Sequence, residues 1–147
     1  NMKTAYAVAL ATHFGTWLKT VRAATSYILE LPLADKNNVN ILGHSLGAQL
    51  ALHAADGNPK LASVVDMAGS FVLPTGAIKA MPPILVLHGT KDTTVPLSRE
   101  RQLISVLKRT NSTYEELILS GVDHSFSGVS FDTLTKIINA FLIKHRR

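Results

Sequence analysis

Apolar side chains recur at helical spacing in four segments of the chain. In the first segment, Trp17, Val21 and Ile28 fall on one side of a helix, while Lys19 and Arg22 fall on the other. This spacing separates a buried face from a solvated one, as an amphipathic helix requires. The pattern predicts four helices, at residues 16–30, 46–55, 97–109 and 130–145.

Short apolar runs alternate with these helices and predict strands at residues 39–42, 63–67, 84–87 and 114–119. The run at 84–87 is wholly apolar, which is typical of a strand buried on both faces of a parallel sheet. Residues 68–83 contain several Gly and Pro residues and are predicted to be irregular. The alternation indicates an α/β fold with about four parallel strands and helices on both faces of the sheet.

The composition fits one globular domain that spans residues 1–147. Hydrophobic residues make up 46% of the chain and charged residues 17%. The formal net charge is +5, but the positive residues are scattered, and the compact group at 144–147 suits the carboxyl end of a helix. No basic stripe with interleaved aromatic side chains points to nucleic acid. Cysteine is absent, which excludes disulfides and thiolate chemistry.

The first residues imitate a short signal peptide. Met2 and Lys3 precede an apolar run, and Ala9-Leu10-Ala11 fits the pattern of a cleavage site. Signal peptides generally have about 15–30 residues and a more strongly charged start. No apolar run approaches the roughly 20 residues that span a bilayer. We therefore expect a cytoplasmic protein without a membrane partner, and secretion is the less favoured alternative.

The motif G-x-S-x-G lies between the strand at 39–42 and the helix at 46–55, as Gly43-His44-Ser45-Leu46-Gly47. In this context the glycines permit a sharp strand-to-helix turn, which exposes the serine oxygen at the carboxyl edge of the sheet. The N–H group of Leu46 then faces the position of a developing oxyanion. The motif predicts Ser45 as a nucleophile and Leu46 as an oxyanion donor.

A serine hydroxyl needs a neighbouring base to become a good nucleophile. Asp92 follows the strand at 84–87, and His124 follows the strand at 114–119. Both residues therefore reach the edge of the sheet that carries Ser45, in the chain order serine, acid, histidine. We predict a catalytic triad of Ser45, Asp92 and His124.

Two other acids compete with Asp92. Asp66 lies near the end of the strand at 63–67 and is the serious rival, whereas Asp123 adjoins His124 too closely to orient its ring and suits a loop cap better. No group of histidines and carboxylates has the spacing of metal ligands, and no Gly-rich phosphate loop is present. Neither a metal nor a cofactor is expected.

The other histidines are weaker candidates for the base. His44 lies inside the motif, with a side chain expected to point away from Ser45. His88 ends a buried strand and is expected to be a hydrogen-bonded structural residue. The remaining histidines suit surface or packing positions: His13, His53 and His145.

The irregular segment 68–83 follows the second strand at the same edge of the sheet. It is therefore predicted to wall a pocket for the acyl group of a substrate. The predicted substrate-binding residues are His44, Met67, Phe71 and Val72.

The sequence resembles the α/β-hydrolase superfamily and, within it, the dienelactone-hydrolase-like esterases. The resemblance spans roughly residues 16–145 and rests on four segments, 17–24, 41–47, 87–96 and 121–126. It implies hydrolysis of esters or related acyl compounds through an acyl-enzyme, and it supports Asp92 as the acid. Dienelactone hydrolase itself uses cysteine as its nucleophile. Since this chain has Ser45, small carboxylic esters are the expected substrates.

Members of that superfamily usually carry further strands before the one that leads to the nucleophile, so residues 1–147 resemble a truncated or minimal domain. The outer edge of the strand at 39–42 would then expose unpaired N–H and C=O groups. We expect a homodimer or larger homo-oligomer through this edge, with residues 3–14 helping to cover it. Two alternatives stay open: a thioesterase or peptidase with the same triad, and an inactive half-domain that serves as an assembly module.

Overall fold

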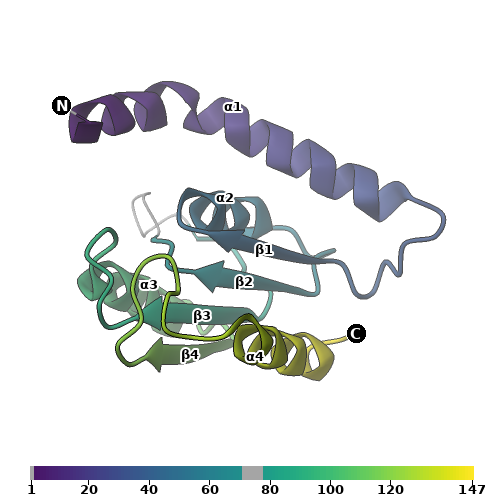
Figure 1. The fold of residues 1–147 in the computed structure, drawn as a ribbon. Coiled ribbons are helices and arrows are strands. Elements are labelled where there is room, and N and C mark those ends of the chain that lie inside the picture. Colours follow the sequence, from purple (N-terminus) through teal and green to yellow (C-terminus); the bar gives the residue numbers. More distant parts are fainter. Residues whose placement is uncertain (1, 71–77) are drawn as a thin grey trace.

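A four-stranded parallel sheet organises the computed structural model, which describes residues 2–70 and 78–147 (Figure 1). The strands lie side by side in chain order, with Leu42 opposite Val65 and Val65 opposite Leu85. Their bounds are β1 (Asn40–His44), β2 (Ser63–Met67), β3 (Ile84–Gly89) and β4 (Tyr114–Leu119). The predicted α/β class with four parallel strands is confirmed.

Helices cover both faces of this sheet, as the sequence predicts (Figure 1). Their bounds are α1 (Met2–Glu30), α2 (Leu46–Ala55), α3 (Leu97–Arg109) and α4 (Phe131–Lys144). The helices α2 and α3 pack on one face, α4 packs on the other, and α1 lies along α2.

Each face of the sheet has its own hydrophobic core, because successive side chains of a strand point to opposite faces. Val64 and Val86 face α2 and α3, whereas Val65 and Leu85 face α4. All four side chains are at most 3% exposed. The central strands are therefore mostly apolar between the two helical layers, and their buried polar side chains are Ser63, Asp66 and His88.

The first helix begins at Met2 instead of residue 16. Residues 2–15 are rich in alanine, the best helix former, and the cost of about 1 kcal/mol for the lone Gly15 does not stop the helix. On the face of this helix that contacts α2, the ring centroids of Phe14 and His53 lie 5.1 Å apart. Arg22 also donates a hydrogen bond of 2.9 Å to the His53 carbonyl. Residues 3–14 thus belong to a helix that packs on α2.

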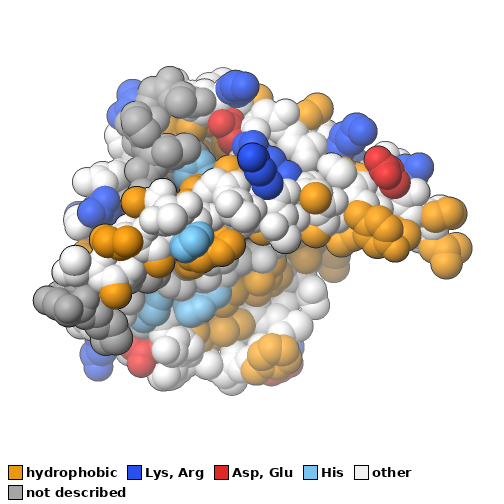
Figure 2. Space-filling model, turned by 90° about the horizontal axis from the view of Figure 1, so that it is seen from above, with side chains coloured by type: hydrophobic (Ala, Val, Ile, Leu, Met, Phe, Trp, Pro, Cys, Tyr) orange, Lys and Arg blue, Asp and Glu red, His pale blue; other side chains and the backbone are white. Residues whose placement is uncertain are grey.

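The strand β1 forms one edge of the sheet within the described part of the chain. Its Leu42 side chain is 52% exposed. Hydrophobic side chains also gather at the C-terminal end of α1 and the loop after it (Figure 2), where Tyr27, Ile28 and Leu33 are exposed. In residues 2–70 and 78–147, no helix combines the length and hydropathy needed to cross a membrane.

A single residue, Ser45, separates β1 from α2, so the chain reverses within a very short turn. A Cβ added to Gly43 would overlap the backbone carbonyl of Gly47, whereas a Cβ added to Gly47 would meet nothing within 4 Å. The two glycines of the motif therefore differ: Gly43 permits the close approach, and Gly47 is not needed for packing.

This difference predicts opposite effects of two alanine substitutions. Gly43→Ala should lower the free energy of unfolding by about 1–3 kcal/mol, the usual cost of overpacking. Gly47→Ala, the matched control inside α2, should leave it unchanged or raise it by up to about 1 kcal/mol. Urea unfolding followed by circular dichroism measures both, and equal stability of the two variants would contradict the assigned contact.

Candidate active site

Ser45 has a backbone conformation that non-glycine residues rarely adopt, with φ 55° and ψ −120°. Such a conformation costs on the order of 1–3 kcal/mol and persists only where the surroundings enforce it. Its N–H donates to the Met67 carbonyl at 2.9 Å, and its own carbonyl accepts from Ala48 N–H at 3.1 Å. These bonds fix Ser45 at the carboxyl edge of the sheet, between the end of β2 and the first turn of α2.

Ser45, His124 and Asp92 form a continuous chain of hydrogen bonds. The Ser45 Oγ lies 2.9 Å from His124 Nε2, and His124 Nδ1 lies 2.7 Å from Asp92 Oδ2. Since a carboxylate accepts, Nδ1 carries the proton and Nε2 is free to accept from the serine hydroxyl. The sequence placed these residues on three loops at one edge, and the structure brings them together.

The Asp92 side chain is buried and held by its own loop. Its Oδ1 accepts from Thr94 N–H and Val95 N–H, each at 2.8 Å. Burial alone would raise the pKa of Asp92, but the hydrogen bonds from His124, Val95 and Thr94 outweigh it and keep the pKa below its usual range. Asp92 is therefore ionised at neutral pH and faces His124 Nδ1.

Backbone contacts join the loop of Asp92 to the loop of His124. Lys91 N–H donates to the Val122 carbonyl at 2.9 Å, and Gly121 N–H donates to Thr90 Oγ1 at 2.8 Å. A Cβ on Gly89 would overlap the Val122 carbonyl, so only glycine allows this approach. The separation of the acid and the histidine is thus set by main-chain atoms together with the Thr90 hydroxyl.

The His44 side chain lies against His124, a contact that the sequence did not predict. Its Nε2 donates to the His124 carbonyl at 2.7 Å, and the two rings lie 5.0 Å apart. The His44 ring also packs edge-to-face with the Phe126 ring, with their centroids 5.9 Å apart. The carbonyl of the His124 loop offers His44 an acceptor that the sequence alone does not reveal, and this contact ties the turn to that loop.

Asp66 is buried at the end of β2 and does not take the place of Asp92. Its Oδ1 accepts from Gly69 N–H at 2.9 Å, and its Oδ2 has no hydrogen-bond partner among the described residues. Burial raises its pKa to about 7, and the Gly69 bond opposes this only in part. The two acids thus differ in environment: only Asp92 is hydrogen-bonded to His124.

The remaining residues predicted to form the site lie at the start of α2, at the end of β2 or outside the described residues. Leu46 begins α2, where the first N–H groups of a helix lack partners within the helix. Met67 ends β2, and its side chain packs against the core that α4 covers. Phe71 and Val72 lie outside the described residues.

Asp123, the acid that adjoins His124 in sequence, accepts hydrogen bonds from Ser125 N–H and Ser127 N–H and so caps its own loop.

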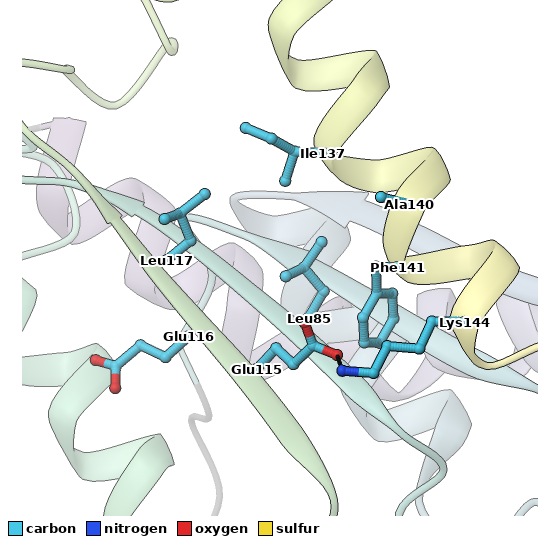
Figure 3. Close-up of a pocket in the computed structure, with 8 residues that line it drawn as sticks. All are labelled: Leu85, Glu115, Glu116, Leu117, Ile137, Ala140, Phe141 and Lys144. Carbon is cyan, nitrogen blue, oxygen red and sulfur yellow. Dashed lines mark hydrogen bonds and ion pairs between the residues drawn. The ribbon is translucent and has the colours of Figure 1, made fainter.

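A separate cavity of about 370 Å³ lies between β4 and α4 (Figure 3). It is lined by Leu85, Glu115, Glu116, Leu117, Ile137, Ala140, Phe141 and Lys144. Lys144 Nζ closes one side of it with a 2.9 Å ion pair to Glu115. None of the predicted site residues that the structure describes lines this cavity.

Glu100, which the sequence motifs do not single out, lies buried beside His88 behind Asp92. A signal was present, since Glu100 precedes Leu103 and Ile104 by three and four positions and so falls on the apolar face of α3. A charged residue on such a face indicates a buried partner. In the described ranges, no group of three or more His, Asp or Glu side chains is arranged to hold a metal ion.

The parallel sheet, the strained turn at Ser45 and the loops at the carboxyl edge define the α/β-hydrolase fold. The chain belongs to the dienelactone hydrolase family, whose sequence model matches residues 3–133. No curated protein sequence matches the chain.

Solved structures with this fold include SOBER1 of Arabidopsis thaliana, at 25% identity and a TM-score of 0.76 over 88% of this chain and 63% of that one. Esterase PE8 is similar at 22% identity, with a TM-score of 0.74 over 86% and 61% of the two chains. A putative dienelactone hydrolase of Klebsiella pneumoniae is 20% identical, with a TM-score of 0.68 over 86% and 60%. The chain therefore spans less than two thirds of the length of these proteins.

The buried Asp66 predicts a pH-dependent stability. Its pKa is about 7 in the folded chain against 3.8 for an exposed aspartate. The folded state therefore holds more protons between these values, and its contribution to the free energy of unfolding falls as pH rises from about 4 to about 7. Asp66→Asn should remove this loss, so the variant gains stability relative to the natural chain as pH rises.

Urea unfolding at pH 5 and pH 8 measures this change. Asp132→Asn is the matched control, because that side chain is 73% exposed, and it should show no such trend. A stability difference between Asp66→Asn and the natural chain that stays constant over the two pH values would contradict the prediction.

Proposed function

We propose that the chain is a serine hydrolase that cleaves small carboxylic esters through an acyl-enzyme, with Ser45, His124 and Asp92 as its catalytic triad. The observation that carries this proposal is the hydrogen-bonded chain from Ser45 Oγ through the imidazole to a buried, ionised carboxylate. Membership of the dienelactone hydrolase family supports hydrolysis, and the similarity to an esterase supports esters as the substrate class.

In the first half-reaction, Ser45 Oγ attacks the ester carbonyl while His124 Nε2 takes the hydroxyl proton. The imidazolium then donates this proton to the departing alcohol, and the acyl group stays on Ser45. Asp92 holds Nδ1–H and stabilises the positive charge that forms on the ring. In the second half-reaction, His124 activates water, which releases the acid and restores the serine.

The tetrahedral intermediate carries a negative charge on the former carbonyl oxygen. Leu46 N–H, at the N-terminus of α2, is the proposed donor for this oxyanion, where the helix dipole also favours negative charge. Met67, Phe71 and Val72 are proposed to contact the acyl group. His44 is proposed to contact the substrate through its ring, because its Nε2 is bonded to the His124 carbonyl.

The same triad can cleave thioesters or peptides, so the substrate class needs a direct comparison. A series of p-nitrophenyl esters of increasing chain length, matched thioesters and a dipeptide p-nitroanilide would rank the three classes by kcat/KM. The proposal expects short esters to rank first. No cofactor enters any step.

We also propose that two copies associate through the outer edge of β1. A two-fold contact pairs this edge with itself, joins the N–H and C=O groups that no described strand pairs, and covers the exposed Leu42. Sedimentation equilibrium at micromolar concentration should give twice the mass of one chain, and Leu42→Lys should shift the distribution toward the monomer. A natural chain that stays monomeric would overturn this proposal without affecting the proposed chemistry.

The nucleophile assignment predicts selective labelling of Ser45. A fluorophosphonate probe should react covalently with the natural chain, because only an activated serine attacks it. Ser45→Ala should abolish labelling and lower ester turnover by on the order of 10⁴–10⁶. Intact mass spectrometry and peptide mapping identify the modified residue.

Paired aspartate variants provide the control. Asp92→Asn should slow labelling strongly, about 10⁴-fold by analogy with other triads, because the amide favours the wrong tautomer of the histidine. Asp66→Asn should label at nearly the natural rate. Unlabelled natural protein would support the inactive assembly module instead, and a larger loss in Asp66→Asn than in Asp92→Asn would refute the choice of acid.

A further inference from the structure

A second buried polar pair lies directly behind Asp92. His88, at the end of β3, and Glu100, on α3, are each 1% exposed. Burying two ionisable side chains in a hydrophobic layer costs free energy unless they form hydrogen bonds or ion pairs with one another or with a neighbour. Neither residue takes part in the proposed reaction, so their presence calls for another explanation.

The proton on His88 Nε2 is placed by its neighbour. This nitrogen lies 2.9 Å from the Val95 carbonyl, which can only accept, so Nε2 must donate. The same Nε2 lies 3.5 Å from Asp92 Oδ2, the oxygen that accepts from His124 Nδ1. The N–H of His88 is therefore hydrogen-bonded to the Val95 carbonyl, and the Asp92 carboxylate lies 3.5 Å from the same nitrogen.

The other nitrogen of His88 faces Glu100. Nδ1 lies 3.1 Å from Glu100 Oε2, and neither atom has a hydrogen-bond partner among the described residues. In a neutral imidazole with a proton on Nε2, Nδ1 presents a lone pair. Two lone pairs at this distance would repel one another, and a proton between the ring and the carboxyl group would remove that repulsion. A neutral carboxylic acid at Glu100 can supply such a proton.

The surroundings of Glu100 favour that acid form. Burial, and then the nearby Glu116 and Asp66, raise the pKa of Glu100 to about 8, and Arg101 opposes them only in part. At neutral pH, Glu100 therefore adds no negative charge behind Asp92. Two side chains that can accept its proton lie against the carboxyl group, Glu116 and His88.

We propose that His88 is a positioning residue for Asp92, and that neutral Glu100 holds His88 in the tautomer whose N–H faces the turn of Asp92. In this arrangement, Glu100 donates to His88 Nδ1, and His88 Nε2–H secures the Val95 carbonyl and lies against Asp92 Oδ2. The carboxylate is thereby kept toward His124. This inference rests on the proposed function, since positioning of Asp92 matters only if Asp92 orients a catalytic base.

Ionisation of Glu100 breaks this arrangement, because a carboxylate cannot donate to Nδ1. The rate should therefore fall as pH rises through about 8, the pKa of Glu100. Glu100→Gln replaces the acid by an amide whose NH₂ group donates at every pH. This variant should keep most of the rate at pH 7 and lose the fall at alkaline pH.

The experiment measures kcat and KM for a short p-nitrophenyl ester from pH 6 to pH 10, together with the rate of fluorophosphonate labelling. His88→Leu and Glu100→Leu should lower kcat roughly 10²-fold with little change in KM, the effect of a misplaced catalytic group. Val106→Ala is the matched control, because Val106 is buried on α3 but absent from the pair, and it should keep the natural kcat.

Natural kcat in His88→Leu, or an alkaline fall that persists unchanged in Glu100→Gln, would overturn the inference. If the leucine variants do not fold, the Glu100→Gln profile and ¹⁵N NMR of the natural chain decide. The inference requires His88 Nδ1 to be unprotonated at pH 7, and an imidazolium signal would refute it. A natural chain that resists the fluorophosphonate would instead overturn the proposed function, and the NMR result would still report the tautomer.

Discussion

The close approach of Gly43 to the Gly47 carbonyl is the constraint on which the site depends. It lets a single residue, Ser45, form the whole connection between β1 and α2, and this residue takes a positive φ. A longer connection would relax this strain, but it would also move the serine away from the helix N-terminus. Because the approach involves main-chain atoms on both sides, no neighbouring side chain can adapt to a larger residue at position 43.

The charge distribution around this turn depends on the pKa values of three buried carboxyl groups. Asp92 receives hydrogen bonds that outweigh its burial and is held ionised, whereas burial raises the pKa of Asp66 to about 7 and that of Glu100 to about 8. The negative charge is therefore concentrated at Asp92, beside the ring on which positive charge is proposed to form. Were Glu100 ionised as well, two buried carboxylates would lie on either side of His88 and repel one another.

The structural features that the sequence predicted correctly are those determined by a few consecutive residues. The strand at 84–87 is apolar throughout, and the motif around Ser45 carries its glycines and serine within five residues. The start of α1 was missed because residues 2–15 have helix propensity but no strong apolar stripe. The contacts of His44 and Glu100 were missed because their partners, the His124 carbonyl and His88, are brought near only by the fold.

This division has a physical basis. Atoms proposed to react lie on turns at the strand ends, where a local motif determines the backbone, so residue type and spacing suffice to locate them. The protonation states that would make them reactive depend on burial and on groups from β2, β3, α3 and β4, which only the folded chain brings together. A positive φ and two buried carboxyl groups with raised pKa values all cost stability. The two hydrophobic cores, one on each face of the sheet, must offset that cost, and so the apolar strands are as much a condition for the site as the serine itself.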